Sequence, residues 1–161
     1  MRRLITGLVA AGALVASGVL PAVAADSGTT SAPNRCEQKN TYRNVETGYY
    51  LDVKGAGGSG ADVITWRWNG KPNQYWCMER ASEGGWYFHP SYNLGLCMDS
   101  PAGGDGAPVI WNCKGNENQR FNVGGERIQL RRSGKYVIGT KGEGGQVRMG
   151  AQTSNSLDSW R

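Results

Sequence analysis

Short apolar or aromatic runs alternate with turns rich in Gly, Asn, Asp and Ser along most of the chain. No window of about twelve residues shows the apolar period of an amphipathic helix. This alternation predicts β-strands joined by tight turns, with about four strands in each third of the chain and no significant helix. The clearest predicted strands are residues 49–53, 62–68, 86–89, 95–98, 108–112, 127–131, 135–138 and 146–149.

One set of polar and aromatic residues occurs twice within this pattern, in the same order. The first copy contains Asp52, Trp66, Asn73 and Gln74, and the second contains Asp99, Trp111, Asn118 and Gln119. The two acids are 47 residues apart, and a third, degenerate copy ends at residues 157–160. A period of 20–50 residues indicates repeated structural units that share one core. We place the three units at about residues 38–80, 81–125 and 126–161.

An aromatic residue closes each copy of the repeat: Trp76, Phe121 and Trp160. A unit of this size cannot bury its own hydrophobic face. Three units that close around one axis can share a core and leave few sheet edges exposed. We therefore expect the three aromatics to occupy equivalent core positions in an all-β domain that spans residues 36–161.

The N-terminal segment has the composition of a secretory signal peptide. Arg2-Arg3 precedes an apolar run over residues 4–20, and Ala22-Val23-Ala24 supplies small residues for cleavage after Ala24. A membrane anchor is the alternative, but Gly, Ser and Thr interrupt the run and no stop-transfer pattern follows. We expect residues 1–24 to be removed and the mature, secreted chain to begin with a flexible segment at residues 25–35.

The charge of the chain is mildly basic. The formal net charge is +5, and loss of Arg2 and Arg3 with the signal peptide lowers it to about +3. No run of four like charges occurs, whereas a nucleic-acid-binding surface needs clustered basic residues. No later segment is apolar enough to span a bilayer. These observations argue against nucleic-acid binding and against membrane insertion.

Four cysteines in an exported chain favour two disulfides, for which three pairings are possible. Cys97 and Cys113 lie at equivalent ends of a predicted strand pair within one repeat. Cys36 precedes the first repeat, and Cys77 directly follows its closing aromatic. We favour the pairs Cys97–Cys113 and Cys36–Cys77. A zinc site is the alternative, but no C-x-x-C spacing occurs and His89 is the only histidine.

The acid, the Trp, the Asn-Gln pair and the closing aromatic at matched spacing resemble the ricin B-type lectin repeat, which also occurs in family 13 carbohydrate-binding modules. The resemblance covers about residues 40–161. It implies a β-trefoil with three pseudo-equivalent sugar pockets. In this family the acid is the main acceptor for sugar hydroxyls, and the Trp is the surface on which the sugar stacks. The Asn-Gln pair completes the contacts with the sugar and holds the acid in place.

The chemistry of these residue types suits a sugar. A carboxylate can accept hydrogen bonds from two vicinal hydroxyls, an amide both donates and accepts, and a flat aromatic can cover the apolar face of a pyranose. The resemblance assigns a first pocket to Asp52, Trp66, Asn73 and Gln74, and a second to Asp99, Trp111, Asn118 and Gln119. Each of these residues also has a structural alternative: the acids could cap turns, the Trp residues could be core, and the amides could tie strand ends.

The chain departs from the family pattern at several positions. Ile64 and Val109 stand where many members have a ligand-binding Gln. Tyr50 and Trp68 occupy the two cysteine positions of the first repeat, and an aromatic pair can pack there instead. The Gly-rich loop of the second repeat, residues 102–106, is shortened, which would lower one wall of the second pocket.

The third repeat has lost the residues of a pocket. Ile138 stands where the acid is expected, Gly150 where the Trp is expected, and Leu157-Asp158 replaces Asn-Gln. We expect no sugar site there and a purely structural role for this unit.

Catalytic residues are not recognisable in the sequence. No Ser/His/Asp or Cys/His catalytic arrangement can be recognised, and His89 has no obvious catalytic partner. Glu79, Glu83, Asp99 and Asp105 could supply the paired carboxylates of a glycoside hydrolase, but nothing marks two of them as a pair. We expect no catalysis, no cofactor and no metal.

The sequence therefore favours a secreted, non-catalytic carbohydrate-binding protein. The resemblance implies galactose-, arabinose- or xylose-containing glycans of cell walls or plant polymers as its ligands. A trefoil used as a protein-interaction unit is the alternative, either as an adaptor in a secreted complex or as an inhibitor of an extracellular enzyme. The lost third pocket and the apolar residues Ile64 and Val109 motivate that alternative.

Overall fold

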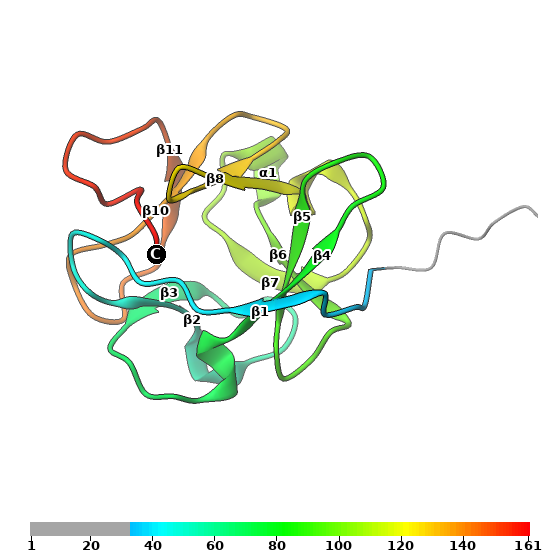
Figure 1. The fold of residues 1–161 in the computed structure, drawn as a ribbon, viewed down its shortest axis with the longest axis horizontal. Helices are drawn as coiled ribbons and strands as arrows, with labels where there is room; N and C mark the ends of the chain where they lie inside the picture. Colours follow the sequence, from blue (N-terminus) through cyan, green and yellow to red (C-terminus); the bar gives the residue numbers. More distant parts are fainter. Residues whose placement is uncertain (1–32) are drawn as a thin grey trace, which may run out of the picture. The chain divides into compact units, whose positions relative to one another are not determined.

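The computed structural model describes residues 33–161, which form eleven β-strands (Figure 1). The strands are β1 (Gln38–Asn40), β2 (Tyr50–Val53), β3 (Val63–Trp66), β4 (Trp76–Arg80), β5 (Trp86–Pro90), β6 (Leu96–Asp99), β7 (Val109–Asn112), β8 (Phe121–Gly124), β9 (Arg127–Leu130), β10 (Tyr136–Ile138) and β11 (Arg148–Gly150). Single turns of helix separate some of them: η1 (Lys54–Ala56), η2 (Pro72–Gln74), α1 (Pro101–Gly104) and η3 (Glu117–Gln119).

The predicted signal peptide, residues 1–24, lies outside the described residues. Of the segment predicted to be flexible, only residues 33–35 are described. There Pro33 is buried, and the guanidinium Nε of Arg35 donates to Oε1 of Glu79 at 3.3 Å. No helix within the described range is long and apolar enough to cross a membrane.

The strands form one seven-stranded sheet and two separate hairpins. The sheet order is β1-β4-β5-β8-β9-β10-β11, and the hairpins are β2–β3 and β6–β7. The first two repeats thus contribute one separate hairpin each, β2–β3 and β6–β7, whereas the equivalent pair of the third repeat, β10–β11, joins the sheet through β9. This is the predicted all-β trefoil.

The ring of strands closes between the two ends of the described chain. The backbone N–H of Arg43 donates to the carbonyl of Arg161 at 2.6 Å, and the N–H of Arg161 donates back at 2.8 Å. An isolated antiparallel bridge joins Asn44 to Trp160 beside this pair. The bridge takes the place of a twelfth strand, so pairing closes an edge that would otherwise be exposed.

The eight clearest predicted strands are all present, and no end is displaced by more than two residues. The absence of significant helix is also confirmed. Although α1 spans four residues, its Ala102 and Gly103 have φ angles of 53° and 70°, which are not helical. The segment is an irregular turn, and its Gly-rich sequence permits the left-handed conformation.

The three closing aromatics lie in the core, as predicted. Trp76 and Phe121 are fully buried, and Trp160 is nearly so. Each indole N–H is satisfied: Trp76 Nε1 donates to the carbonyl of Leu51 at 3.1 Å, and Trp160 Nε1 to that of Val137 at 2.9 Å. A buried indole needs such a partner, so these two hydrogen bonds tie the end of a repeat to its own hairpin.

Both predicted disulfides are present, Cys36–Cys77 and Cys97–Cys113. In the first repeat, the rings of Tyr50 and Trp68 pack at a centroid distance of 4.7 Å. An aromatic pair therefore occupies the place of the missing disulfide, as the sequence predicted.

Candidate functional site

A hollow of about 450 Å³ lies against the β2–β3 hairpin. Asp52 on β2, Trp66 at the end of β3 and Asn73 on η2 line it. The local sequence positions Asn73, because Pro72 begins η2 at a helical position where its missing N–H costs nothing. Further lining residues are Lys54, Ile64, Asn69, Lys71 and Gly144. Three of the four residues predicted for the first pocket therefore meet around one open space.

Asp52 is almost completely buried, yet one of its oxygens is unpartnered. Its Oδ1 accepts a hydrogen bond from Nδ2 of Asn73 at 2.8 Å, while Oδ2 has no partner within the described part of the protein. Burial raises the pKa of Asp52 to about 6, and the nearby amides of Gln74 and Asn73 oppose the rise. A buried acceptor without a donor is unfavourable, so the hydrogen-bonding capacity of the Asp52 carboxylate is not fully used among the described residues.

Gln74 lies behind the first hollow rather than in its lining. It is fully buried, its Nε2 donates to the carbonyl of Arg67 at 2.8 Å, and its Oε1 accepts from the N–H of Asn69 at 2.8 Å. These bonds fix the turn between β3 and η2, so the structure favours the strand-tying alternative for this residue.

Trp66 forms an exposed wall of the first hollow, with 37% of its surface accessible. Gly144, from the third repeat, lies against its ring: a Cβ at this position would be 2.9 Å from Cζ3 of Trp66. The neighbouring Glu143 accepts hydrogen bonds from both the backbone and the guanidinium of Arg67, the closest nitrogens being 2.5 and 2.6 Å away. The sequence did not predict this contact, because it joins residues more than 70 positions apart.

A second hollow, of about 350 Å³, lies at the equivalent place in the second repeat. Asp99 on β6, Trp111 on β7 and Asn118 on η3 line it, together with Val109 and Lys114. Trp111 is 41% exposed, and the Lys114 ammonium lies 5.9 Å from its ring centroid. Val109, like Ile64 in the first repeat, gives its hollow an apolar wall.

The acid of the second hollow is held by a different amide. Nε2 of Gln119 donates to Oδ2 of Asp99 at 2.9 Å and also to the carbonyl of Asn112 at 2.9 Å. Burial raises the pKa of Asp99, while the Gln119 hydrogen bond and the Lys114 ammonium oppose the rise. In this repeat it is Oδ1 of Asn118 that is buried without a partner among the described residues. The two hollows thus share residue types but differ in which polar atom is free.

The third repeat lacks both an acid and an aromatic at the matching positions. Gly150 lies directly under Ile138, because a Cβ there would be 2.8 Å from Cδ1 of Ile138. Asp158 is fully buried and is engaged by Nε of Arg127 at 2.9 Å and Oγ1 of Thr153 at 2.7 Å. The absence of a sugar site here stays a prediction, and these contacts are consistent with a structural role.

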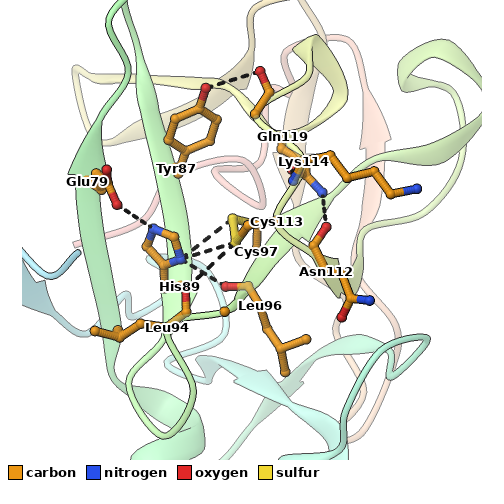
Figure 2. The surroundings of a disulfide bond; sticks show 12 residues. Glu79, Tyr87, His89, Leu94, Leu96, Cys97, Asn112, Cys113, Lys114 and Gln119 are labelled. Atoms are coloured by element: carbon orange, nitrogen blue, oxygen red, sulfur yellow. Dashed lines mark hydrogen bonds and ion pairs between the residues drawn. A yellow bond between two sulfur atoms is a disulfide. The ribbon is translucent and has the colours of Figure 1, made fainter. Parts of the chain in front are cut away.

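The only histidine of the sequence lies beside a disulfide (Figure 2). His89 is fully buried, its Nδ1 is 2.9 Å from the carbonyl of Leu96, and its Nε2 is 3.5 Å from Oε2 of Glu79. Burial lowers the pKa of His89, whereas the Leu96 carbonyl and the Glu79 carboxylate oppose this. Nδ1 also lies 3.4 and 3.5 Å from the two sulfurs of Cys113 and Cys97. Both sulfurs are bonded to each other, so neither is available as a thiolate ligand for a metal.

Comparison with known proteins identifies the fold. Residues 35–111 match the family described as ricin-type β-trefoil lectin domain-like, which confirms the resemblance inferred from the repeats. The structure is similar to ThreeFoil, a designed threefold-symmetric protein, at 21% identity and a TM-score of 0.68, covering 76% of this chain and 96% of that one. It is also similar to the β-trefoil lectin of the Vibrio vulnificus hemolysin/cytolysin, solved with N-acetyl-D-lactosamine bound, at 18% identity and a TM-score of 0.62, covering 76% and 91%.

A third similar structure is an exo-β-1,3-galactanase from Clostridium thermocellum, at 20% identity and a TM-score of 0.68. The match covers 78% of this chain but only 30% of the galactanase, so the similarity concerns one part of that enzyme. No curated protein matches the sequence. At these identities the solved structures establish the fold alone, and the function has to be argued from the two hollows.

Proposed function

We propose that the protein is a secreted, non-catalytic lectin with two sugar pockets, one in each of its first two repeats. The β-trefoil lectin-like fold supports carbohydrate binding as the general function. The first pocket would use Asp52, Trp66 and Asn73 directly, with Gln74 fixing the turn behind them. The second would use Asp99, Trp111 and Asn118, with Gln119 bracing Asp99.

One observation supports this proposal above the others. In the first hollow, the Asp52 carboxylate, whose Oδ2 has no hydrogen-bond partner among the described residues, and the exposed ring of Trp66 line one open space. A sugar hydroxyl can donate to the Asp52 carboxylate while the apolar face of the sugar ring covers the indole. A site of this kind has an aromatic wall and a few convergent polar groups. The same pair of residue types recurs in the second hollow.

Galactose-, arabinose- or xylose-containing glycans of cell walls or plant polymers are the proposed ligands. Each pocket would bind weakly, because few contacts have to offset the loss of ligand freedom. Two pockets on one rigid domain would then increase the apparent affinity for a polymer that reaches both.

Isothermal titration with galactan, arabinan and xylan tests this function on the purified mature protein. We expect binding to at least one polymer, and we expect Asp52→Ala combined with Asp99→Ala to abolish it. Glu37→Gln, a change of a surface acid outside both hollows, is the matched control and should bind as the parent does. Undiminished binding by the double variant would refute the pocket assignment.

A protein-interaction unit is the second candidate function. It is supported by the third repeat, which keeps the scaffold while Ile138 and Gly150 replace the acid and the aromatic of a pocket. A glycan array and a pull-down from culture supernatant separate the two functions. A silent array together with one stoichiometric protein partner would favour the interaction unit.

A further inference from the structure

The residues of the first hollow share one face of the β2–β3 hairpin. In this hairpin Asp52 pairs with Ile64, and Tyr50 pairs with Trp66. Residues that pair directly project to the same face of a sheet, and so do alternate residues along one strand. Tyr50 therefore lies on the face that carries Asp52 and Trp66, one position beyond the hollow.

Trp68 packs on Tyr50 just past the end of this strand pair. It is 46% exposed, more than Trp66 at 37% or Trp111 at 41%. Tyr75 supports it from a second side, edge-on, at a centroid distance of 5.6 Å. An indole held by two other rings is already ordered, so a ligand that stacks on it loses little additional freedom of the protein.

The turn after β3 borders both the first hollow and Trp68. Asn69 and Lys71 line the hollow, while a Cβ on the intervening Gly70 would lie 3.9 Å from the Trp68 ring. A glycan chain that leaves the hollow across residues 69–71 would therefore meet the exposed surface of Trp68 next.

The second repeat lacks any counterpart of this aromatic surface. Cys97 and Cys113 occupy the positions equivalent to Tyr50 and Trp68 and form a disulfide. They are 0% and 8% exposed, respectively. The two hollows thus differ in their surroundings as well as in their polar contacts.

We propose that Trp68, supported by Tyr50 and Tyr75, is a second sugar subsite that stacks on the next pyranose of a glycan whose first residue occupies the Asp52–Trp66 hollow. This inference rests on the proposed function and narrows it. The first pocket takes an extended oligosaccharide or polysaccharide chain, whereas the second takes a single sugar residue.

Ladders of defined oligosaccharides test the subsite in two single-pocket variants of the full mature protein. Asp99→Ala leaves only the first pocket, and Asp52→Ala leaves only the second. Titration would use galactose, arabinose and xylose together with their di- to hexasaccharides. We expect the first-pocket variant to bind the disaccharide or trisaccharide about fivefold or more tightly than the monosaccharide, and the second-pocket variant to show no such gain.

Two changes at the subsite separate stacking from folding. Trp68→Ala in the first-pocket variant should remove the gain with chain length and leave monosaccharide affinity unchanged. The double change Tyr50→Cys and Trp68→Cys should also remove the gain with chain length. It would introduce a disulfide at the position where the second repeat has its own. Thermal unfolding would verify that each variant is folded.

The outcomes distinguish failure of the subsite from failure of the lectin function. Monosaccharide binding without a gain on chain elongation, or a gain that survives both Trp68 changes, overturns the subsite alone. Absence of binding to every member of every ladder overturns the lectin function and the subsite with it.

Discussion

Asp52 is a buried acid whose ionised form is unfavourable in the folded protein. Its native pKa of about 6 lies above that of an ordinary Asp, because burial penalises the ionised form. The folded protein therefore holds this proton more tightly than the unfolded chain. As the pH rises from about 4 through 6, the native state loses that advantage, so the ionised carboxylate lowers stability at neutral pH. A ligand that donates to the Asp52 carboxylate would offset this cost.

The raised pKa predicts acid-sensitive binding at the first pocket. A carboxylate accepts hydroxyl hydrogen bonds most strongly when ionised. In the Asp99→Ala variant, we expect the affinity measured by titration at pH 5 to be about tenfold below its plateau above pH 7.

Asp52→Asn in the same background is the control for this titration. The amide does not ionise, so any residual binding should be flat over this pH range. A profile for the Asp52 form that is equally flat would contradict the role of its carboxylate.

The sequence predicts best the site residues that can be recognised from their residue type and their position within a single repeat. The acids and platforms, Asp52, Trp66, Asp99 and Trp111, lie around hollows as the repeat predicted. For Gln74, the residue type alone does not distinguish a ligand-binding amide from a structural one. Its role became visible only through the two hydrogen bonds that commit it to the turn after β3.

At the scale of elements, the first pocket is built from two repeats. The β2–β3 hairpin supplies Asp52 and Trp66, while the loop before β11 supplies Gly144, which lies against the indole. The second pocket has a similar but looser arrangement, since a Cβ on Gly60 of the first repeat would be 3.8 Å from Trp111. No pattern within one repeat could predict these walls, because they depend on how the three units close.

Gly144→Ala is expected to weaken sugar binding at the first pocket. The new methyl group would meet Trp66 at 2.9 Å, and the positive φ of 78° adds backbone strain. We expect at least about a fivefold loss in the affinity of the Asp99→Ala variant for its sugar, measured by titration, because the indole has to move.

Gly125→Ala provides the matched control for Gly144→Ala. Gly125 also has a positive φ, of 57°, but a Cβ added at this position would have no neighbouring atom within 4 Å. It therefore carries the strain without the contact, and binding should be unchanged. Equal losses from the two substitutions would mean that strain, not the approach to Trp66, weakens the site.

At the scale of the whole domain, the third repeat completes the barrel. Trp160 packs in the core, donates to the carbonyl of Val137 and forms a bridge with Asn44 next to the pairing of Arg43 with Arg161. The same repeat supplies the wall of the first pocket. The structural role of the third repeat could be predicted from its retained closing aromatic. Its contribution to the first pocket could not, because that contribution depends on how the ring of strands closes.

Trp160→Ala should destabilise the domain by about 3–5 kcal/mol, because it removes a large buried aromatic. Urea unfolding followed by tryptophan fluorescence and by circular dichroism would measure the loss. Both signals should change in a single transition, since the three repeats share one core.

Trp160→Phe is the matched variant, because Phe121 already closes the second repeat. It keeps most of the packing but loses the hydrogen bond to Val137, so a cost of about 1–2 kcal/mol is expected. Similar costs for the Ala and Phe variants would show that the hydrogen bond, rather than the packing, dominates at this position.

The contact between Gly144 and Trp66 has a consequence for protein engineering. A graft of residues 38–80 into another trefoil would carry the acid and the aromatic of the first pocket but leave the loop around Gly144 behind. The transferable module is therefore discontinuous: the first repeat together with residues 140–146 of the third. If the recipient scaffold has a bulky residue at that loop, the graft would contain the acid and the aromatic of the pocket, but the pocket would not have the same shape.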